Sequence, residues 1–153
     1  MHAVKVAILG GAGGTGASIA FNLLLLQASL EIVVVDSREA MVTSHLMDLE
    51  QVLEQSPGST LASGTEQEVP AADVVVVTAA APLTVNTSRL IYLADNAGIL
   101  DGVADLLPSG WEGVVVVVTN PVDALVTRLQ RRTGVGMGLP ELILRACLST
   151  GPV

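Results

Sequence analysis

A glycine-rich segment near the N-terminus has the spacing of a phosphate-binding turn. Residues 10–16 read Gly-Gly-Ala-Gly-Gly-Thr-Gly and stand between an apolar run and a helix-like stretch. Gly11 permits a tight turn, Gly13 lets the backbone approach a pyrophosphate, and Gly16 lets the helix pack closely on the preceding strand. The N-terminus of that helix presents free N–H groups and a positive dipole end to the phosphates. The segment therefore predicts a binding site for a dinucleotide.

An acidic residue after the second apolar run indicates which coenzyme would bind. Asp36 comes directly after residues 32–35, Ile-Val-Val-Val. Its carboxylate can accept hydrogen bonds from ribose hydroxyls and would repel a 2′-phosphate, so it favours NAD over NADP. Arg38 leaves the alternative open, because an arginine nearby can accept a 2′-phosphate. Two other interpretations of this layout are a structural turn in an unrelated α/β protein and a site for FAD or S-adenosylmethionine.

Composition restricts the class of protein. The chain has 153 residues, of which 50% are hydrophobic and 2% aromatic, and this is typical of one domain around a parallel sheet buried on both faces. The net charge is −8, and non-specific nucleic-acid binding needs clustered cations, so no nucleic-acid partner is expected. A single cysteine, Cys147, gives no disulfide framework and favours a reduced, cytoplasmic location. The valine tracts 74–77 and 114–118 are too short to cross a bilayer. We expect neither a membrane partner nor a metal site.

Short apolar runs alternate with longer helical segments along the whole chain. Strands are expected near residues 3–9, 31–36, 59–63, 73–78, 113–119 and 142–147, and helices near 15–28, 39–55, 88–107 and 121–133. This alternation predicts an α/β fold, a doubly wound parallel (Rossmann) sheet of about six strands with helices on both faces. Residues 1–153 would then form one dinucleotide-binding domain.

In such a sheet, ligands bind beyond the carboxyl ends of the strands, where the strand order reverses. Four separate segments of this chain end there, and their convergence is a stronger signal than any single motif. The predicted cofactor-binding residues are Gly10, Gly11, Gly13, Gly14, Thr15, Gly16, Asp36, Thr78, Ala79, Ala80, Thr119 and Asn120.

With these motifs in place, the chain resembles the malate and lactate dehydrogenase family, and most of all malate dehydrogenase. The similar segments are residues 8–16, 33–36, Asp48, 78–80, 89–90, 96–99, 118–123 and 138–140. They cover nearly the whole chain, in the family's order and at its spacings. The resemblance implies an NAD-dependent oxidoreductase that transfers hydride between the coenzyme and a 2-hydroxy or 2-oxo acid.

The resemblance also implies roles for individual residues. Arg89 would close over the site and polarise the substrate carbonyl, and Asn120 would hydrogen-bond the substrate oxygen beside the nicotinamide. The helix expected at 39–55 matches a helix that packs across the subunit interface in the family, which implies a homo-oligomer. Its apolar residues are Met41, Val42, Leu46, Leu49 and Leu53. His2 and His45 match no family site, and a solvated or interface role is expected for His45.

The chain departs from the family pattern in its substrate loop and in its length. Leu83 stands where malate dehydrogenases carry an arginine for the distal carboxylate, and Ala80 replaces a glycine near the cofactor. The family's catalytic histidine lies in a second domain that residues 1–153 do not include, so this chain alone is expected to be inactive. The alternative is a non-catalytic NAD-binding or interaction module. A short-chain reductase is rejected, because Asn96 rather than lysine follows Tyr92 at the fourth position.

Overall fold

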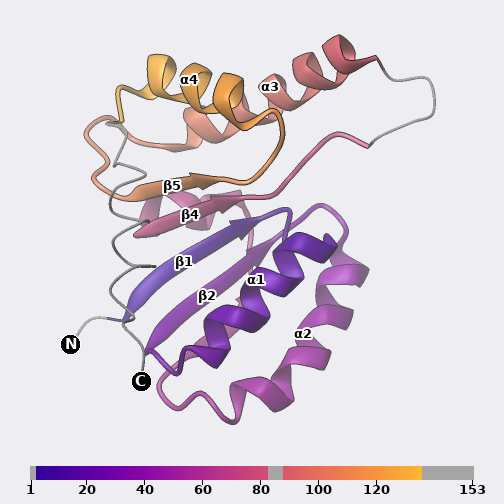
Figure 1. Ribbon diagram of the computed structural model, residues 1–153. Helices are drawn as coiled ribbons and strands as arrows, with labels where there is room; N and C mark the ends of the chain where they lie inside the picture. The colour runs from indigo at the N-terminus through magenta and orange to yellow at the C-terminus, as the bar shows by residue number, and fades with distance from the viewer. Residues whose placement is uncertain (1–2, 83–87, 136–153) are drawn as a thin grey trace, which may run out of the picture.

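The computed structural model describes residues 3–82 and 88–135, which alternate between strands and helices (Figure 1). The strands are β1 (Val4–Leu9), β2 (Leu30–Val35), β3 (Thr60–Ser63), β4 (Val74–Val77) and β5 (Val114–Val117). The α-helices are α1 (Gly14–Leu25), α2 (Glu39–Leu53), α3 (Arg89–Leu106) and α4 (Val122–Thr133), and a 3₁₀ helix, η1, spans Glu66–Ala71. Five predicted strands and all four predicted helices are confirmed, whereas the strand expected at 142–147 lies outside the described residues.

All neighbouring strands run parallel, in the order β3-β2-β1-β4-β5. The chain first builds outward from β1 through β2 to β3, and then returns to the other side of β1 to build β4 and β5. Leu9, the last residue of β1, pairs with Val35 on one side and with Val77 on the other. The carboxyl ends of β2 and β4 therefore flank the end of β1, as the doubly wound fold requires.

The two faces of the sheet are covered by different helices. Figure 1 shows α1 and α2 together on one side of the sheet and α3 and α4 together on the other. Val6 and Ile8 pack into the core with α1 and α2, whereas Ala7 and Leu9 pack into the opposite core with α3 and α4. Because successive side chains of a strand point to opposite faces, strands buried on both faces appear in the sequence as continuous apolar runs.

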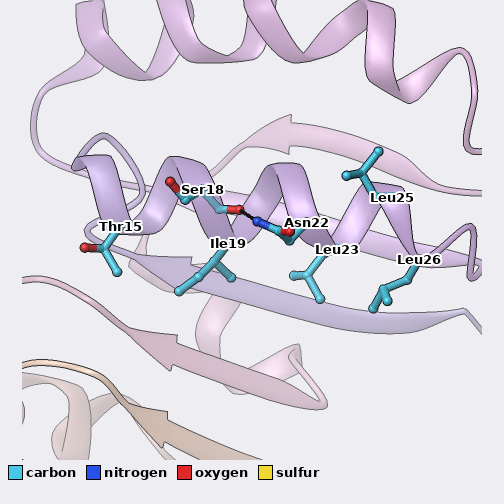
Figure 2. Close-up of a pocket in the computed structure, with 7 residues that line it drawn as sticks. All are labelled: Thr15, Ser18, Ile19, Asn22, Leu23, Leu25 and Leu26. Carbon is cyan, nitrogen blue, oxygen red and sulfur yellow. Dashed lines mark hydrogen bonds between the residues drawn. The ribbon is translucent and has the colours of Figure 1, made fainter. Parts of the chain in front are cut away.

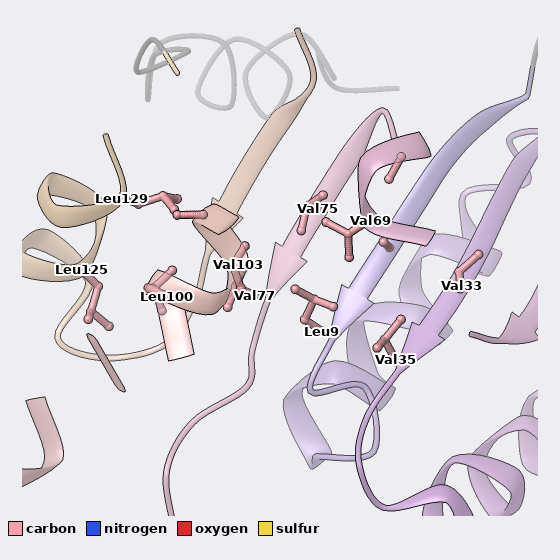
Figure 3. Close-up of a cluster of buried hydrophobic side chains, with 13 residues drawn as sticks. Leu9, Val33, Val35, Val69, Val75, Val77, Leu100, Val103, Leu125 and Leu129 are labelled. Carbon is pink, nitrogen blue, oxygen red and sulfur yellow. The ribbon is translucent and has the colours of Figure 1, made fainter. Parts of the chain in front are cut away.

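The core beneath α3 and α4 consists of aliphatic side chains (Figure 3). Its fully buried members include Val75 and Val77 of β4, Leu100 of α3 and Leu125 of α4. Ion pairs on the solvent side join the same helices: Arg128 to Asp101 at 2.7 Å, and Arg132 to Asp105 at 2.6 Å and to Asp101 at 3.5 Å. These contacts fix α3, one face of which borders the functional cleft described below.

Within the described ranges, the helices show no sign of a membrane span, because none combines the necessary length with sufficient apolar character. The same residues contain no group of three or more histidine, cysteine or acidic side chains placed to hold a metal ion.

Candidate dinucleotide-binding site

A cleft of about 1140 Å³ opens beyond the carboxyl ends of the central strands. Its walls are the glycine loop, residues 35–39 after β2, residues 64–67, residues 78–80 and part of α3. Ligand sites in proteins typically enclose about 300–1,000 Å³, so the space suits a large ligand. Of the predicted cofactor-binding residues, those that line the cleft are Gly10, Gly13, Asp36, Thr78, Ala79 and Ala80.

The glycine loop is tied to the end of β2 by its own backbone. The amides of Gly10 and Gly11 both donate to the carbonyl oxygen of Val35, at 2.9 and 3.2 Å. Gly10 has a φ of +84°, a backbone conformation that residues other than glycine rarely adopt. A Cβ on Gly16 would lie 2.6 Å from the carbonyl oxygen of Gly10, so the close packing of helix on strand requires glycine there.

The start of α1 is arranged to receive an anion. Gly13 is the N-cap residue, and no side chain caps the helix. The first turn, from Gly14 through Thr15 to Gly16, contains no acidic residue. The first N–H groups of a helix have no partner within the helix, and they carry its positive dipole end. A Cβ on Gly14 would meet nothing within 4 Å, so the backbone here is open to a ligand.

Thr78 holds the glycine loop against the end of β4. Its hydroxyl lies 2.9 Å from the carbonyl oxygen of Leu9 and 3.1 Å from that of Gly10, and its backbone amide also donates to Leu9. Ala79 adds a further backbone hydrogen bond to the Leu9 carbonyl. Thr78 was predicted to bind the cofactor, and the structure gives it a positioning contact in addition to its place in the cleft wall.

Asp36 is held by four hydrogen bonds at the end of β2. The backbone amide of Ala12 donates to Oδ2 at 3.0 Å, and the remaining three donors come from Arg38. The hydrogen bonds from the Arg38 side chain hold the pKa of the Asp36 carboxyl below its usual value, although burial acts in the opposite direction. Asp36 is therefore ionised at neutral pH, and it links the glycine loop to the beginning of α2.

The segment at the end of β5 is connected to the segment that follows β4 by the buried side chain of Thr119. Thr119 is buried, and its hydroxyl donates to the carbonyl oxygen of Ala79 at 2.7 Å. The next residue, Asn120, is exposed, and it precedes a cis peptide bond to Pro121. Neither Thr119 nor Asn120 lines the cleft of about 1140 Å³. Arg89 is the first residue of α3, and its side chain lies outside the described part of the structure.

Sequence reasoning missed two polar residues near this site. Asn96 of α3 is fully buried, and it accepts a hydrogen bond from the amide of Ala81 and donates one to the carbonyl of Asn120. A lone amide side chain among apolar helix residues was the available signal. His45 was assigned a solvated or interface role, but its Nε2 lies 3.2 Å from the carbonyl oxygen of Ala12 in the glycine loop. His45 is half-buried, so this contact adds to the predicted solvated or interface role, which stays a prediction.

A second hollow, of about 410 Å³, follows the outer surface of α1 (Figure 2). It is lined by Thr15, Ser18, Ile19, Asn22, Leu23, Leu25 and Leu26. The polar group of Asn22 is already engaged, because its amide donates to the carbonyl of Ser18 at 2.7 Å. Leu25 and Leu26 are 53% and 69% exposed. Thr15, one of the predicted cofactor-binding residues, lines this groove and not the cleft, and the groove's mainly apolar lining lacks the features of a coenzyme site.

The strand order, the glycine loop and the acid after β2 define a dinucleotide-binding domain of the NAD type. The family model of the lactate/malate dehydrogenase NAD-binding domain matches residues 4–137, and the chain belongs to this family. The resemblance found in the sequence is thereby confirmed, together with NAD as the coenzyme of the domain.

Curated relatives include two L-lactate dehydrogenases. The chain is 30% identical over 133 residues to the enzyme of Mycoplasmopsis pulmonis, and 34% identical over 131 residues to L-lactate dehydrogenase 2 of Lactiplantibacillus plantarum. Each match covers 85% of this chain and 42% of the relative. The chain thus spans less than half the length of the relatives that it matches.

Solved structures of both kinds of dehydrogenase share the fold. The ligand-bound minor L-lactate dehydrogenase of Enterococcus mundtii aligns with a TM-score of 0.77 at 28% identity, covering 87% of this chain and 43% of that one. Malate dehydrogenase of Archaeoglobus fulgidus, in complex with NADH, aligns with a TM-score of 0.73 at 28% identity, covering 86% of this chain and 45% of that one. The relatives therefore include both lactate and malate dehydrogenases. The comparisons do not single out malate dehydrogenase, although the sequence motifs had led us to expect this.

Proposed function

We propose that this domain is the coenzyme-binding half of a dehydrogenase that interconverts a 2-hydroxy acid and a 2-oxo acid. The observation that supports this most strongly is the cleft at the ends of β1, β2 and β4, where an uncapped helix start faces the same space as Asp36. The nicotinamide of the bound coenzyme would supply the hydride chemistry. The chain's own residues position the ligand: the loop 10–16 takes the pyrophosphate and Asp36 takes the ribose hydroxyls.

The substrate side of the proposal relies on Arg89 and Asn120. Asn120 is exposed at the carboxyl end of β5, and Arg89 begins α3. They would orient and polarise the carbonyl, and a general acid would come from a second domain outside residues 1–153. Leu83, which lies outside the described residues, lacks the charge that a second substrate carboxylate would need, so we propose a monocarboxylate in preference to a dicarboxylate.

The proposal also covers the oligomeric state of the protein and its location in the cell. We propose that a second copy of the chain packs against α2 and that the protein works in the cytoplasm, in line with its single cysteine. The structure shows that Val42 and Leu49 of the predicted apolar stripe are buried within the domain itself. Met41 and Met47, which are 43% and 65% exposed, remain as the apolar surface of α2 that a partner copy could cover.

Calorimetric titration of NADH into the 153-residue chain tests the proposed function. One NADH should bind per chain with measurable heat, and prior saturation with NAD should remove the signal. A folded chain that binds neither NADH nor NAD would overturn the proposal.

A further inference from the structure

Arg38 occupies a position in the cleft that bears on which coenzyme can enter. Its carbonyl oxygen accepts hydrogen bonds from the amides of Met41 and Val42, so its backbone is fixed at the start of α2. From there its side chain reaches back to Asp36 and to the glycine loop. A Cβ on Gly13 would lie 3.8 Å from Nη2 of Arg38, so the guanidinium borders the space expected for the pyrophosphate.

The hydrogen-bond capacity of Asp36 is fully used by neighbouring groups. Oδ1 accepts from the backbone N and from Nε of Arg38, and Oδ2 accepts from Nη2 of Arg38 and from the amide of Ala12, all at 3.0 Å. A carboxylate offers about four acceptor positions. A ribose diol can therefore bind Asp36 only by displacing donors of Arg38 or by sharing their acceptors. The acceptor positions that would make Asp36 selective for NADH are therefore already occupied by donors of this chain.

The charge around Asp36 also differs from that of a site with an unpaired carboxylate. Within the described lining, Arg38 is the only basic residue, and Asp36, Glu39 and Glu66 are acidic. The pairing of Arg38 with Asp36 neutralises the carboxylate that would otherwise repel a 2′-phosphate. Arg38 has donors to spare, because a guanidinium carries five N–H groups and the side chain of Asp36 takes two of them. Its side chain is 51% exposed, so the remaining donors can reach a ligand.

We propose that Arg38 is a specificity-determining residue that lets this cleft accept the 2′-phosphate of NADPH as well as the free ribose of NADH. Arginine is suited to this task because its planar fork binds phosphate oxygens through two hydrogen bonds at once. Glu39 and Glu66 keep the preference on the side of NADH. The inference rests on the proposed binding of a nicotinamide dinucleotide in this cleft.

The test compares dissociation constants for NADH and NADPH in four forms of the chain. These are the wild type, Arg38→Ala, Arg38→Lys and Arg131→Ala, each checked for folding by circular dichroism. Arg131 is exposed on α4, outside the cleft lining, so its removal controls for the loss of one positive charge. Arg38→Lys keeps the charge but loses the fork, and it serves as the second test should Arg38→Ala fail to fold.

We expect the wild type to bind NADPH less than about tenfold more weakly than NADH. Arg38→Ala should raise the ratio of the two dissociation constants at least threefold, mainly by weakening NADPH, and Arg38→Lys should raise it in the same direction. Arg131→Ala should leave the ratio unchanged. A smaller rise in Arg38→Ala, or an equal rise in Arg131→Ala, overturns the role of Arg38 while NADH binding still stands. A folded wild-type chain that does not bind NADH overturns the proposed function itself.

Discussion

The side chain of Asn96 donates a hydrogen bond to the backbone carbonyl of Asn120 across 2.8 Å, although 24 residues separate them in the chain. The other end of the same amide accepts from the backbone of Ala81, also at 2.8 Å. One fully buried side chain therefore joins the segments that follow β4 and β5, the two places where a substrate and a nicotinamide ring are expected to meet.

Asn96→Ala should destabilise the domain. It would remove the hydrogen bonds to the Ala81 amide and the Asn120 carbonyl, each of which contributes about 0.5–1.5 kcal/mol, because both partners are only partly buried or exposed. Asn96→Asp is the matched variant, because it keeps an acceptor for Ala81 and removes the donor to Asn120. Urea unfolding should rank wild type above Asn96→Asp and Asn96→Ala. Equal midpoints in all three would show that these hydrogen bonds contribute nothing.

Gly13→Val should abolish NADH binding and leave the fold intact. Gly13 has a φ of −80°, which any residue can adopt, and its Cβ would lie 3.3 Å from the carbonyl oxygen of Gly10, a tight contact that a shift of a few tenths of an ångström relieves. The larger valine side chain would project into the space expected for the pyrophosphate. Ser18→Val is the control, because Ser18 is exposed on α1 outside the lining of the cleft. NADH titrations on both variants check this, and unchanged affinity in folded Gly13→Val would mean that the loop is only structural.

The ion pair of Asp36 should make stability depend on pH in the acidic range. Arg38 lowers the pKa of Asp36 in the folded protein, so the unfolded chain binds this proton more readily. The stabilisation is complete above the unfolded pKa of about 3.9 and is lost as the pH falls through the folded value. Its size should be about 1 kcal/mol, since the guanidinium is half exposed.

Urea unfolding of the wild type and Asp36→Asn at pH 5, 4, 3 and 2.5 measures this contribution. The difference in unfolding free energy between the two should shrink as the pH falls. A difference that stays constant down to pH 2.5 would contradict the assigned ion pair.

The 153-residue chain should not reduce pyruvate or oxaloacetate at a measurable rate with NADH. Positioned acid–base groups contribute about 10²–10⁴-fold to such reactions. His45 is the histidine within the described residues, and its ring lies against the Ala12 carbonyl on the glycine-loop side. A coupled absorbance assay at 340 nm would detect turnover. Activity that disappears in His45→Ala would show that the catalytic acid has been assigned wrongly.

The exposed methionines of α2 should make self-association sensitive to a single charge. If a second copy packs on Met41 and Met47, Met47→Glu should shift the mass from light scattering towards one chain. Leu90→Glu controls for the added charge, because Leu90 is 77% exposed on α3, which covers the other face of the sheet. A wild-type chain that is monomeric at high concentration would argue against the dimer.

The strands of the sheet could be predicted from the sequence, because the apolar runs that indicate them are local features of the chain. Apolar runs that end at glycine, aspartate or threonine predicted β1, β2, β4 and β5 to within two residues, and the polar strand β3 followed from its place in the alternation. The 3₁₀ helix η1 was missed because it contains Pro70 and has no helical periodicity. The glycine loop and Asp36 were found for the same local reason.

The contacts that organise the site could not be predicted, because they join residues that are distant in the sequence. Nothing near Asn96 indicates that its partners are Ala81 and Asn120, and nothing near Thr78 indicates that its hydroxyl reaches Leu9. Arg38 is close to Asp36 in sequence, yet its three hydrogen bonds to the Asp36 carboxylate depend on how the chain turns into α2.

The central place of β1 has a consequence for how the protein is made. Val6 pairs with Ile32 on one side and with Val74 on the other, so β1 is synthesised well before the second of its two neighbours. Until residues 74–77 have been synthesised, the backbone N–H and C=O groups along one edge of β1 have no partner strand, and open edges of this kind promote aggregation. The strand on which the glycine loop is built is therefore open to mispairing until nearly half of the 153 residues have been synthesised.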